Sequence, residues 1–382
     1  MSRNDLRSQS LDLLRFPLAV VVLAIHTFST KGLILQGHEF SVDTYPFFIE
    51  LNHFIDGFLR GQSVPIYFFI SGFVFFLGIE LTKEKYIQKL KNRVKTLLIP
   101  YIIWNSVAIV LLVSRLLPCF RGYLSYLDVK LNMTLSGLLS CFWIYHGELS
   151  PAPVGTEAYI EALSSVHPIN VPLWFVRDLM VVVLFAPLLY WLLKRTRYYL
   201  VLLLGMSWFF LPYLNLELGH SYSLLTAFFF FSWGAYMSIN KKDMLTEFGR
   251  FFKSSVFLYP LLALLYVASV HYFPDMCTTI KRLNVFVGLL FAYNMAAWLL
   301  RKNICKVNPF LASASFFIYV SHSLICGRLV KVMFLLIRPD SNFSIFMVYL
   351  LSLLVTVAFL LLVFYLLRRY TPSFLKVIAG RK

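Results

Sequence analysis

The chain has 382 residues, of which 59% are hydrophobic and only 14% are charged. With a mean hydropathy of +0.74 it has too little polar surface for a soluble globule of this size, so the composition indicates an integral membrane protein. The formal net charge of +17 would also suit nucleic-acid binding. In membrane proteins, however, lysine and arginine collect in cytoplasmic loops, so the positions of these residues decide between the two interpretations.

About ten stretches are long and apolar enough to cross a bilayer as helices, each of which needs about 20 residues. The sequence therefore predicts an all-α, polytopic membrane fold. The predicted spans are residues 11–30, 63–81, 97–117, 171–193, 198–214, 222–239, 255–273, 283–300, 309–337 and 343–367.

Most lysines and arginines fall in every second connecting segment and near both ends of the chain. This pattern predicts that the N- and C-termini are cytoplasmic and that residues 83–95 form a basic cytoplasmic loop near lipid headgroups. Because the positive charge is spread over short loops, nucleic-acid binding is not expected. We expect a single transmembrane domain, residues 1–382, with an exterior loop at about 118–170 and a cytoplasmic tail at about 368–382.

Several other features are less informative. The first apolar run lacks a small-residue cleavage site, so we expect a retained helix. The short apolar stretch 131–145 is expected to lie at the interface or to cap the bundle. A disulfide between Cys119 and Cys141 is one option, but unpaired cysteines are the preferred expectation. Eight histidines are scattered without a close pair on one helix, so no metal site is predicted.

The first predicted span contains an arginine and a histidine, Arg15 and His26. Their spacing of eleven residues is about three helical turns, so both side chains fall within roughly 20° of one face, about 16 Å apart along the axis. Because either residue would be costly in lipid, the spacing predicts that both point into the protein and line one channel. The alternatives are that Arg15 reaches the headgroups and pairs with Asp12, and that His26 forms a structural hydrogen bond near the outer interface.

Five motifs extend this argument along nearly the whole chain. They are residues 11–15 followed by His26, then 68–73, 93–101, 172–179, and 315–319 followed by His322. In this order they resemble the motifs of the bacterial membrane acyltransferase 3 family, which includes O-acetyltransferases of surface polysaccharides. The resemblance implies a multi-pass enzyme of the bacterial inner membrane. It would transfer an acyl group, with acetyl expected, from cytoplasmic acyl-CoA to a hydroxyl of a carbohydrate or lipid-linked glycan, without a permanently bound cofactor.

Within this resemblance, His26 is the candidate general base, since a histidine with a pKa near 7 can remove the hydroxyl proton. Arg15 is expected near the cytoplasmic end of its helix, at the level of Arg93 and Lys95. These three cations are predicted to hold the phosphates of the donor. Many family members carry a second arginine where this chain has Lys95, which cannot make a bidentate phosphate contact.

Four further candidates are Trp174, Arg177, Asp178 and His322, which are predicted to position the acceptor or to stabilise the oxyanion. The adjacent residues Arg177 and Asp178 point in different directions, so each is expected to need a separate partner. A structural role is the alternative for these two, and an interhelical hydrogen bond is the alternative for His322. Gly72 predicts close packing between helices.

Two other classes of function stay open at this point. A transporter or flippase would also place charges inside a bundle, although the sequence shows no inverted repeat. A non-catalytic sensor or scaffold would tolerate replacement of both Arg15 and His26.

Overall fold

The protein is described here by a computed structural model, which describes residues 2–28, 33–35, 38–40, 42–114, 129–130, 134–145, 148–149, 167–214 and 220–380. It is a bundle of helices with two short antiparallel strand pairs, β1 (Leu33–Leu35) with β2 (His38–Phe40) and β3 (Val129–Lys130) with β4 (Glu148–Leu149). The helices are α1 (Arg3–Thr27), α2 (Pro46–Leu59), α3 (Ser63–Phe76), α4 (Lys83–Arg93), α5 (Ile99–Ser114), α7 (Leu135–Ser140), α9 (Trp174–Leu184), α10 (Ala186–Thr196), α11 (Tyr199–Phe210), α12 (His220–Ile239), α13 (Met244–Glu247), α14 (Phe252–Tyr272), α15 (Cys277–Arg301), α16 (Pro309–Ser321), α17 (Cys326–Ile337), α18 (Asn342–Tyr370) and α19 (Pro372–Ile378).

Among the described residues, six helical stretches are long and apolar enough to cross a membrane, and up to eight are if each bent pair counts as one span. The two bent pairs are α9 with α10, at 64°, and α16 with α17, at 63°. The apolar helices Tyr199–Leu214 and Ser223–Ile239 are shorter than these spans and are not counted among them. The protein is therefore helical and multi-pass, whereas the count of ten spans and the cytoplasmic termini stay predictions.

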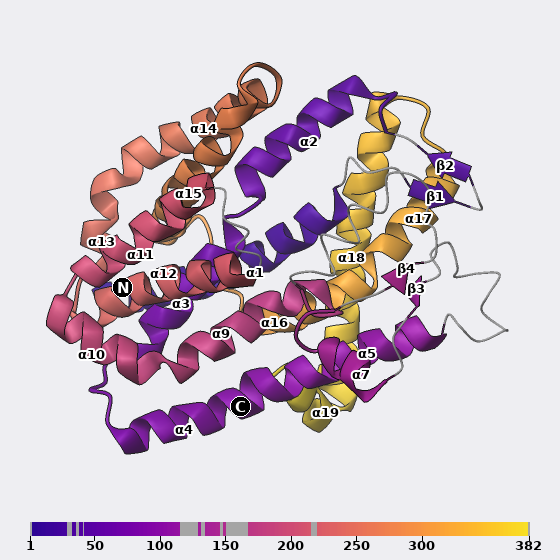
Figure 1. The fold of residues 1–382 in the computed structure, drawn as a ribbon. Coiled ribbons are helices and arrows are strands. Elements are labelled where there is room, and N and C mark those ends of the chain that lie inside the picture. The colour runs from indigo at the N-terminus through magenta and orange to yellow at the C-terminus, as the bar shows by residue number, and fades with distance from the viewer. Residues whose placement is uncertain are drawn as a thin grey trace.

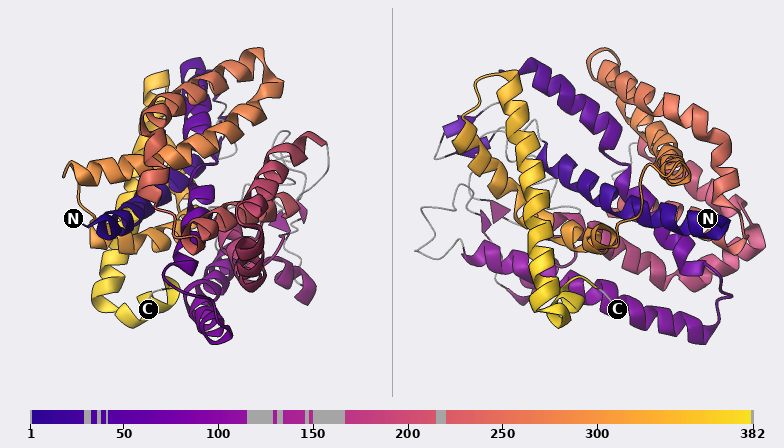
Figure 2. Two further views of the ribbon diagram at one scale, coloured as in Figure 1. Left: turned by 90° about the vertical axis from the view of Figure 1, so that its left-hand side faces the viewer. Right: turned by 180° about the vertical axis from the view of Figure 1, so that it is seen from behind.

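Helix α1 runs through the middle of the bundle (Figure 1). Helices α2, α14 and α15 lie on one side of it, and α4, α5 and α9 lie on the other, as the view from behind also shows (Figure 2). The helix begins with a capping box, in which Ser2 and Asp5 satisfy each other's backbone N–H groups. Its apolar residues, such as Val22, are buried against these neighbours, whereas Arg15 and His26 keep exposed surface.

The closest helix contact joins α3 and α12. A Cβ atom on Gly72 would lie 2.0 Å from the backbone oxygen of Phe231, and one on Gly234 would lie 2.0 Å from that of Phe69. Only glycine allows the two backbones to approach this far. The close packing predicted at Gly72 is thus confirmed.

Two segments differ from the prediction. Helix α2 forms between the first two predicted spans, where Glu50 and Asp56 lower the hydropathy of an otherwise apolar run. Residues 83–93 form α4 rather than a loop, because Thr82 caps the helix by accepting from the Lys85 N–H and the helix continues into α5.

The short apolar stretch 131–145 lies between the two strands of the second pair, β3 and β4. Helix α7 has six residues, too few to cross a bilayer. The Tyr101 hydroxyl of α5 donates to the carbonyl of Phe142, which ties this segment to the bundle. Cys141 is free, and Cys119 lies outside the described residues, so the disulfide between them stays a prediction.

Candidate functional site

A cavity of about 690 Å³ lies among α1, α3, α9, α16 and the segment that joins α4 to α5. Arg15 and Arg93 both line it. The Arg15 guanidinium pairs with Asp12, at 3.3 Å between Nη2 and Oδ1, and 46% of its side chain stays accessible. The ion pair with Asp12 that the sequence offered as an alternative is therefore present. Arg15 lines the cavity with this ion pair in place.

A π-helical turn, Val94–Leu98, follows Arg93 directly and joins α4 to α5 at this cavity. Such a turn has an extra residue, which shifts the direction of the side chains that follow, and it is frequent at functional sites. Thr96 and Leu97 of the turn also line the cavity. Lys95 is exposed and is not among the residues that line it, so its predicted contact with the donor has no support from this geometry.

At the other end of α1, His26 lies against His322. The centroids of the two rings are 5.3 Å apart and the ring planes are inclined by 47°. His322 is fully buried, whereas His26 keeps accessible surface. His26 therefore contacts a buried ring while its own side chain stays exposed, and its predicted orientation into a channel stays a prediction.

His322 sits where the bent pair α16–α17 breaks, in a short 3-10 turn. Its Nδ1 lies 2.8 Å from the carbonyl oxygen of Tyr319 and 3.2 Å from that of Ile318. A carbonyl only accepts, so Nδ1 carries the proton and Nε2 holds the lone pair. Nε2 has no hydrogen-bond partner among the described residues. The pair of histidines therefore includes a buried nitrogen base that is free to accept a proton.

Three aromatic rings line the wall of the cavity, and one of them also lies against His322. Tyr67, Phe175 and Tyr319 line the cavity, and the Tyr319 ring also lies 6.2 Å from the His322 ring. We call these three residues the aromatic septum. The cavity lining contains Arg15 but not His26, so this cavity does not extend along α1 from one residue to the other as the predicted channel would.

The sequence predicted that Arg177 and Asp178 point in different directions and need separate partners, but their side chains bind each other. Arg177 Nε donates to Asp178 Oδ1 at 2.9 Å, and the two side chains are 1% and 0% exposed. The Arg177 guanidinium also donates to the carbonyl of Trp143 and lies over its ring. In this geometry the pair holds the segment after α7 against α9. An oxyanion role for it stays a prediction.

Trp174 begins α9, and its ring stacks on His167, with centroids 6.1 Å apart. Burial, together with the positive charge of Arg177, lowers the pKa of His167 from its ordinary value of 6.5 to about 4. Its Nδ1 is buried with no hydrogen-bond partner among the described residues. His167 was missed in the sequence because no motif surrounds it.

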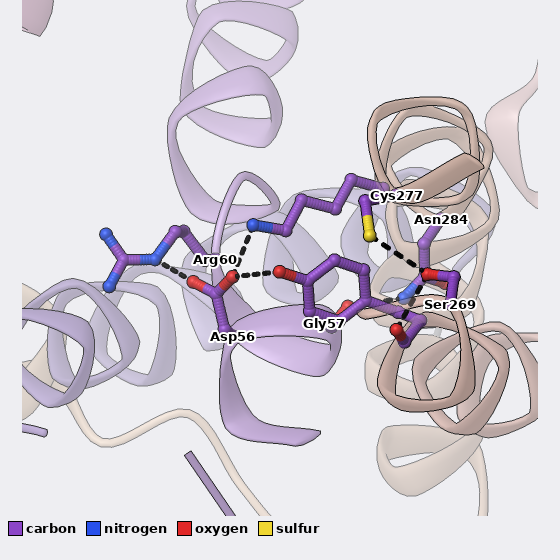
Figure 3. A network of polar contacts seen from close by, with 8 residues as sticks. Asp56, Gly57, Arg60, Ser269, Cys277 and Asn284 are labelled. Atoms are coloured by element: carbon purple, nitrogen blue, oxygen red, sulfur yellow. Dashed lines mark hydrogen bonds and ion pairs between the residues drawn. The ribbon is translucent and has the colours of Figure 1, made fainter. Parts of the chain in front are cut away.

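A second polar cluster joins α2, α14 and α15 (Figure 3). The Asp56 carboxylate accepts from Arg60, Lys281 and the Tyr266 hydroxyl. Arg60 binds through Nε, so its two terminal nitrogens point away from the cluster. Arg60 also acts electrostatically on His26. This cluster could not be predicted, because α2 itself was not recognised.

These features define a multi-pass membrane protein with a cation-lined cavity and, beside it, a buried histidine that contacts a second one. Among the described residues, no group of three His, Cys, Asp or Glu side chains could hold a metal ion. The sequence matches the family described as "Acyltransferase domain" over residues 8–368, and the chain belongs to that family. This confirms the resemblance of the five motifs. The protein is therefore a membrane acyltransferase.

A curated relative gives a narrower comparison. The chain is 26% identical over 327 residues to "Succinoglycan biosynthesis protein ExoH" of Rhizobium meliloti (strain 1021), which covers 84% of this chain and 79% of that protein. No solved structure matches the chain.

Proposed function

We propose that this enzyme transfers an acyl group, with acetyl expected, from cytoplasmic acyl-CoA to a hydroxyl of a cell-surface polysaccharide or lipid-linked glycan. The observation that carries the proposal is the arrangement along α1, where Arg15 faces a cavity and His26 lies beside His322. The printed name of the relative, a succinoglycan biosynthesis protein, supports a polysaccharide acceptor. The proposed location is the bacterial inner membrane, with the cavity on the cytoplasmic side.

The donor site is the cavity. Arg15 and Arg93 bring two guanidinium groups to its wall, and guanidinium groups bind phosphate through strong charge-assisted hydrogen bonds. The phosphates of acyl-CoA would lie there, and the arm that carries the thioester would extend toward the septum. Acyl-CoA is a substrate in this scheme, and no permanently bound cofactor takes part.

The chemistry needs a base, because a sugar hydroxyl is a weak nucleophile at neutral pH. His26 takes the hydroxyl proton while the oxygen attacks the thioester carbonyl carbon. A C–O bond forms, the tetrahedral intermediate collapses, and the C–S bond breaks. The protonated imidazole then returns its proton to the departing thiolate, which leaves as CoA thiol. His322, Trp174, Arg177 and Asp178 are the proposed residues for positioning the acceptor or stabilising the oxyanion.

Two measurements test this function. In the first, surface glycans of cells with and without the protein are compared by mass spectrometry, and the cells that have it should gain the mass of one acetyl group per modified sugar. In the second, proteoliposomes holding the full chain receive radiolabelled acetyl-CoA and a deacetylated glycan from the same cells. Label should appear in the glycan with the wild-type chain and not with H26A. Glycan that crosses the bilayer without acquiring label would overturn the proposal in favour of a transporter.

A further inference from the structure

The aromatic septum is a contiguous layer of three rings. The centroid of the Tyr67 ring lies 5.7 Å from that of Phe175 and 6.2 Å from that of Tyr319, and the Phe175 and Tyr319 centroids are 5.7 Å apart. These distances fall within the range of ordinary aromatic contact, so the rings leave little room between them. One side of the layer faces the cavity, and Tyr319 meets His322 on the other.

Two of the rings are fixed by hydrogen bonds to backbone on different helices. The Tyr67 hydroxyl donates to the carbonyl of Arg15 at 2.7 Å, and the Tyr319 hydroxyl donates to the carbonyl of Pro172. Phe175 has no such anchor, but it is only 7% exposed and packs on Phe68, at 4.7 Å between centroids. The width of any gap between these rings is therefore set by their packing within the bundle. Widening the gap would disturb a close-packed interior.

We propose that the septum determines which acyl groups reach the histidine pair, admitting acetyl and similarly short groups and excluding long chains. This proposal rests on the proposed function, because it assumes that a thioester approaches from the cavity. Any acyl group that reaches the histidines leaves the donor arm between the rings, so the length limit comes from the space that the rings leave on the histidine side. An acetyl group needs little of that space, whereas a long chain needs room for every methylene, and one extra methylene in a tight pocket already changes selectivity by about 10-fold or more.

The septum also separates the thioester from water. If the rings were absent, water in the cavity could attack the thioester carbonyl in place of the acceptor hydroxyl, releasing a carboxylic acid and CoA thiol. Exclusion of water from a reacting centre suppresses such side reactions. Removing one ring should therefore increase the release of CoA thiol in the absence of acceptor.

The test compares Phe175→Ala with Phe230→Ala in the full chain reconstituted in proteoliposomes. Phe230 is an equally buried phenylalanine that packs on Trp208 and Phe286, away from the septum and the cavity. Transfer is measured with acetyl-, butyryl- and octanoyl-CoA. The wild-type chain and F230A should prefer acetyl over octanoyl by at least about 10-fold. F175A should reduce this preference by about 10-fold and release more CoA thiol without acceptor.

Wild-type transfer of octanoyl at the acetyl rate would overturn the proposal, as would an unchanged chain-length preference in F175A. An equal shift in F230A would also overturn it, because the effect would then come from general loosening. Thermal unfolding checks each variant, and Phe175→Leu replaces F175A if the alanine variant does not fold. If the proposed function itself were wrong, the wild-type chain would transfer no acyl group of any length, which distinguishes that failure from a failure of the septum proposal.

Discussion

The imidazole rings of His26 and His322 lie with their centroids 5.3 Å apart, although the residues come from opposite ends of the chain. Helix α1 brings the first, and the break between α16 and α17 brings the second. Nδ1 of His322 donates to the Tyr319 carbonyl, so Nε2 is the ring nitrogen whose lone pair can accept a proton. Because either ring can hold the transferred proton, we expect the effects of replacing His26 and His322 on the acyl-transfer rate to depend on each other.

The first prediction concerns this dependence. His26→Ala should lower the acyl-transfer rate by about 10²–10⁴-fold, the range for loss of a general base. His322→Ala should also lower the rate, and the double variant should lose no more than H26A alone, because residues that act as a unit have non-additive effects. The rates are measured with labelled acetyl-CoA, and thermal unfolding confirms that each variant is folded. Fully additive losses would show that the two rings act separately.

The second prediction separates the two basic residues of one motif. Arg93 lines the cavity, whereas Lys95 is exposed outside it. Arg93→Ala should raise KM for acetyl-CoA by about 10-fold or more, the value of a charge-assisted contact to phosphate. Lys95→Ala should change this KM less than 3-fold, roughly the contribution of an exposed charge. A larger increase in K95A than in R93A would contradict the cavity as the donor site and would support the contact predicted from the sequence.

The hydropathy of the sequence predicted most of the long apolar helices. The helix that it missed has a physical explanation. Each apolar run is visible in the sequence because a bilayer-spanning helix needs a long uninterrupted apolar segment. Helix α2 was missed because Glu50 and Asp56 interrupt its apolar pattern, although Asp56 is neutralised by Arg60 and Lys281. Partners of this kind come from other parts of the chain and leave no local signal.

The same reasoning applies to the candidate site. The motifs identified Arg15, Arg93, His26 and His322, and the structure brings the first two to one cavity and the last two into contact. The aromatic septum could not be foreseen, because its three rings come from α3, α9 and α16, and aromatic residues are common throughout the chain. Helical spacing gives the direction of a side chain but does not show what fills the space beside it.

The third prediction concerns pH. The pKa of His167 is about 4 in the folded protein, below its ordinary value of 6.5, because the ring is buried and Arg177 is near. Between these two values the unfolded chain binds more protons than the folded chain, so stability falls as the pH drops from 6.5 toward 4. His167→Gln should remove this part of the dependence. Thermal unfolding midpoints in detergent, measured across this range, provide the comparison, and parallel curves for the two proteins would contradict the shift.

The fourth prediction distinguishes a buried ion pair from an exposed one. Asp178→Asn leaves the Arg177 guanidinium buried without its anion, which should lower the free energy of unfolding by about 3–5 kcal/mol. The matched control is Lys194→Gln, which breaks an exposed pair with Glu80 and should cost less than about 1 kcal/mol. Unfolding in detergent measures both. The double replacement R177M/D178L should recover part of the loss, because it removes both charges together. If D178N were no less stable than K194Q, the pair would not be what holds the segment around Trp143 against α9, and the alternative of a direct role at the acceptor would gain support.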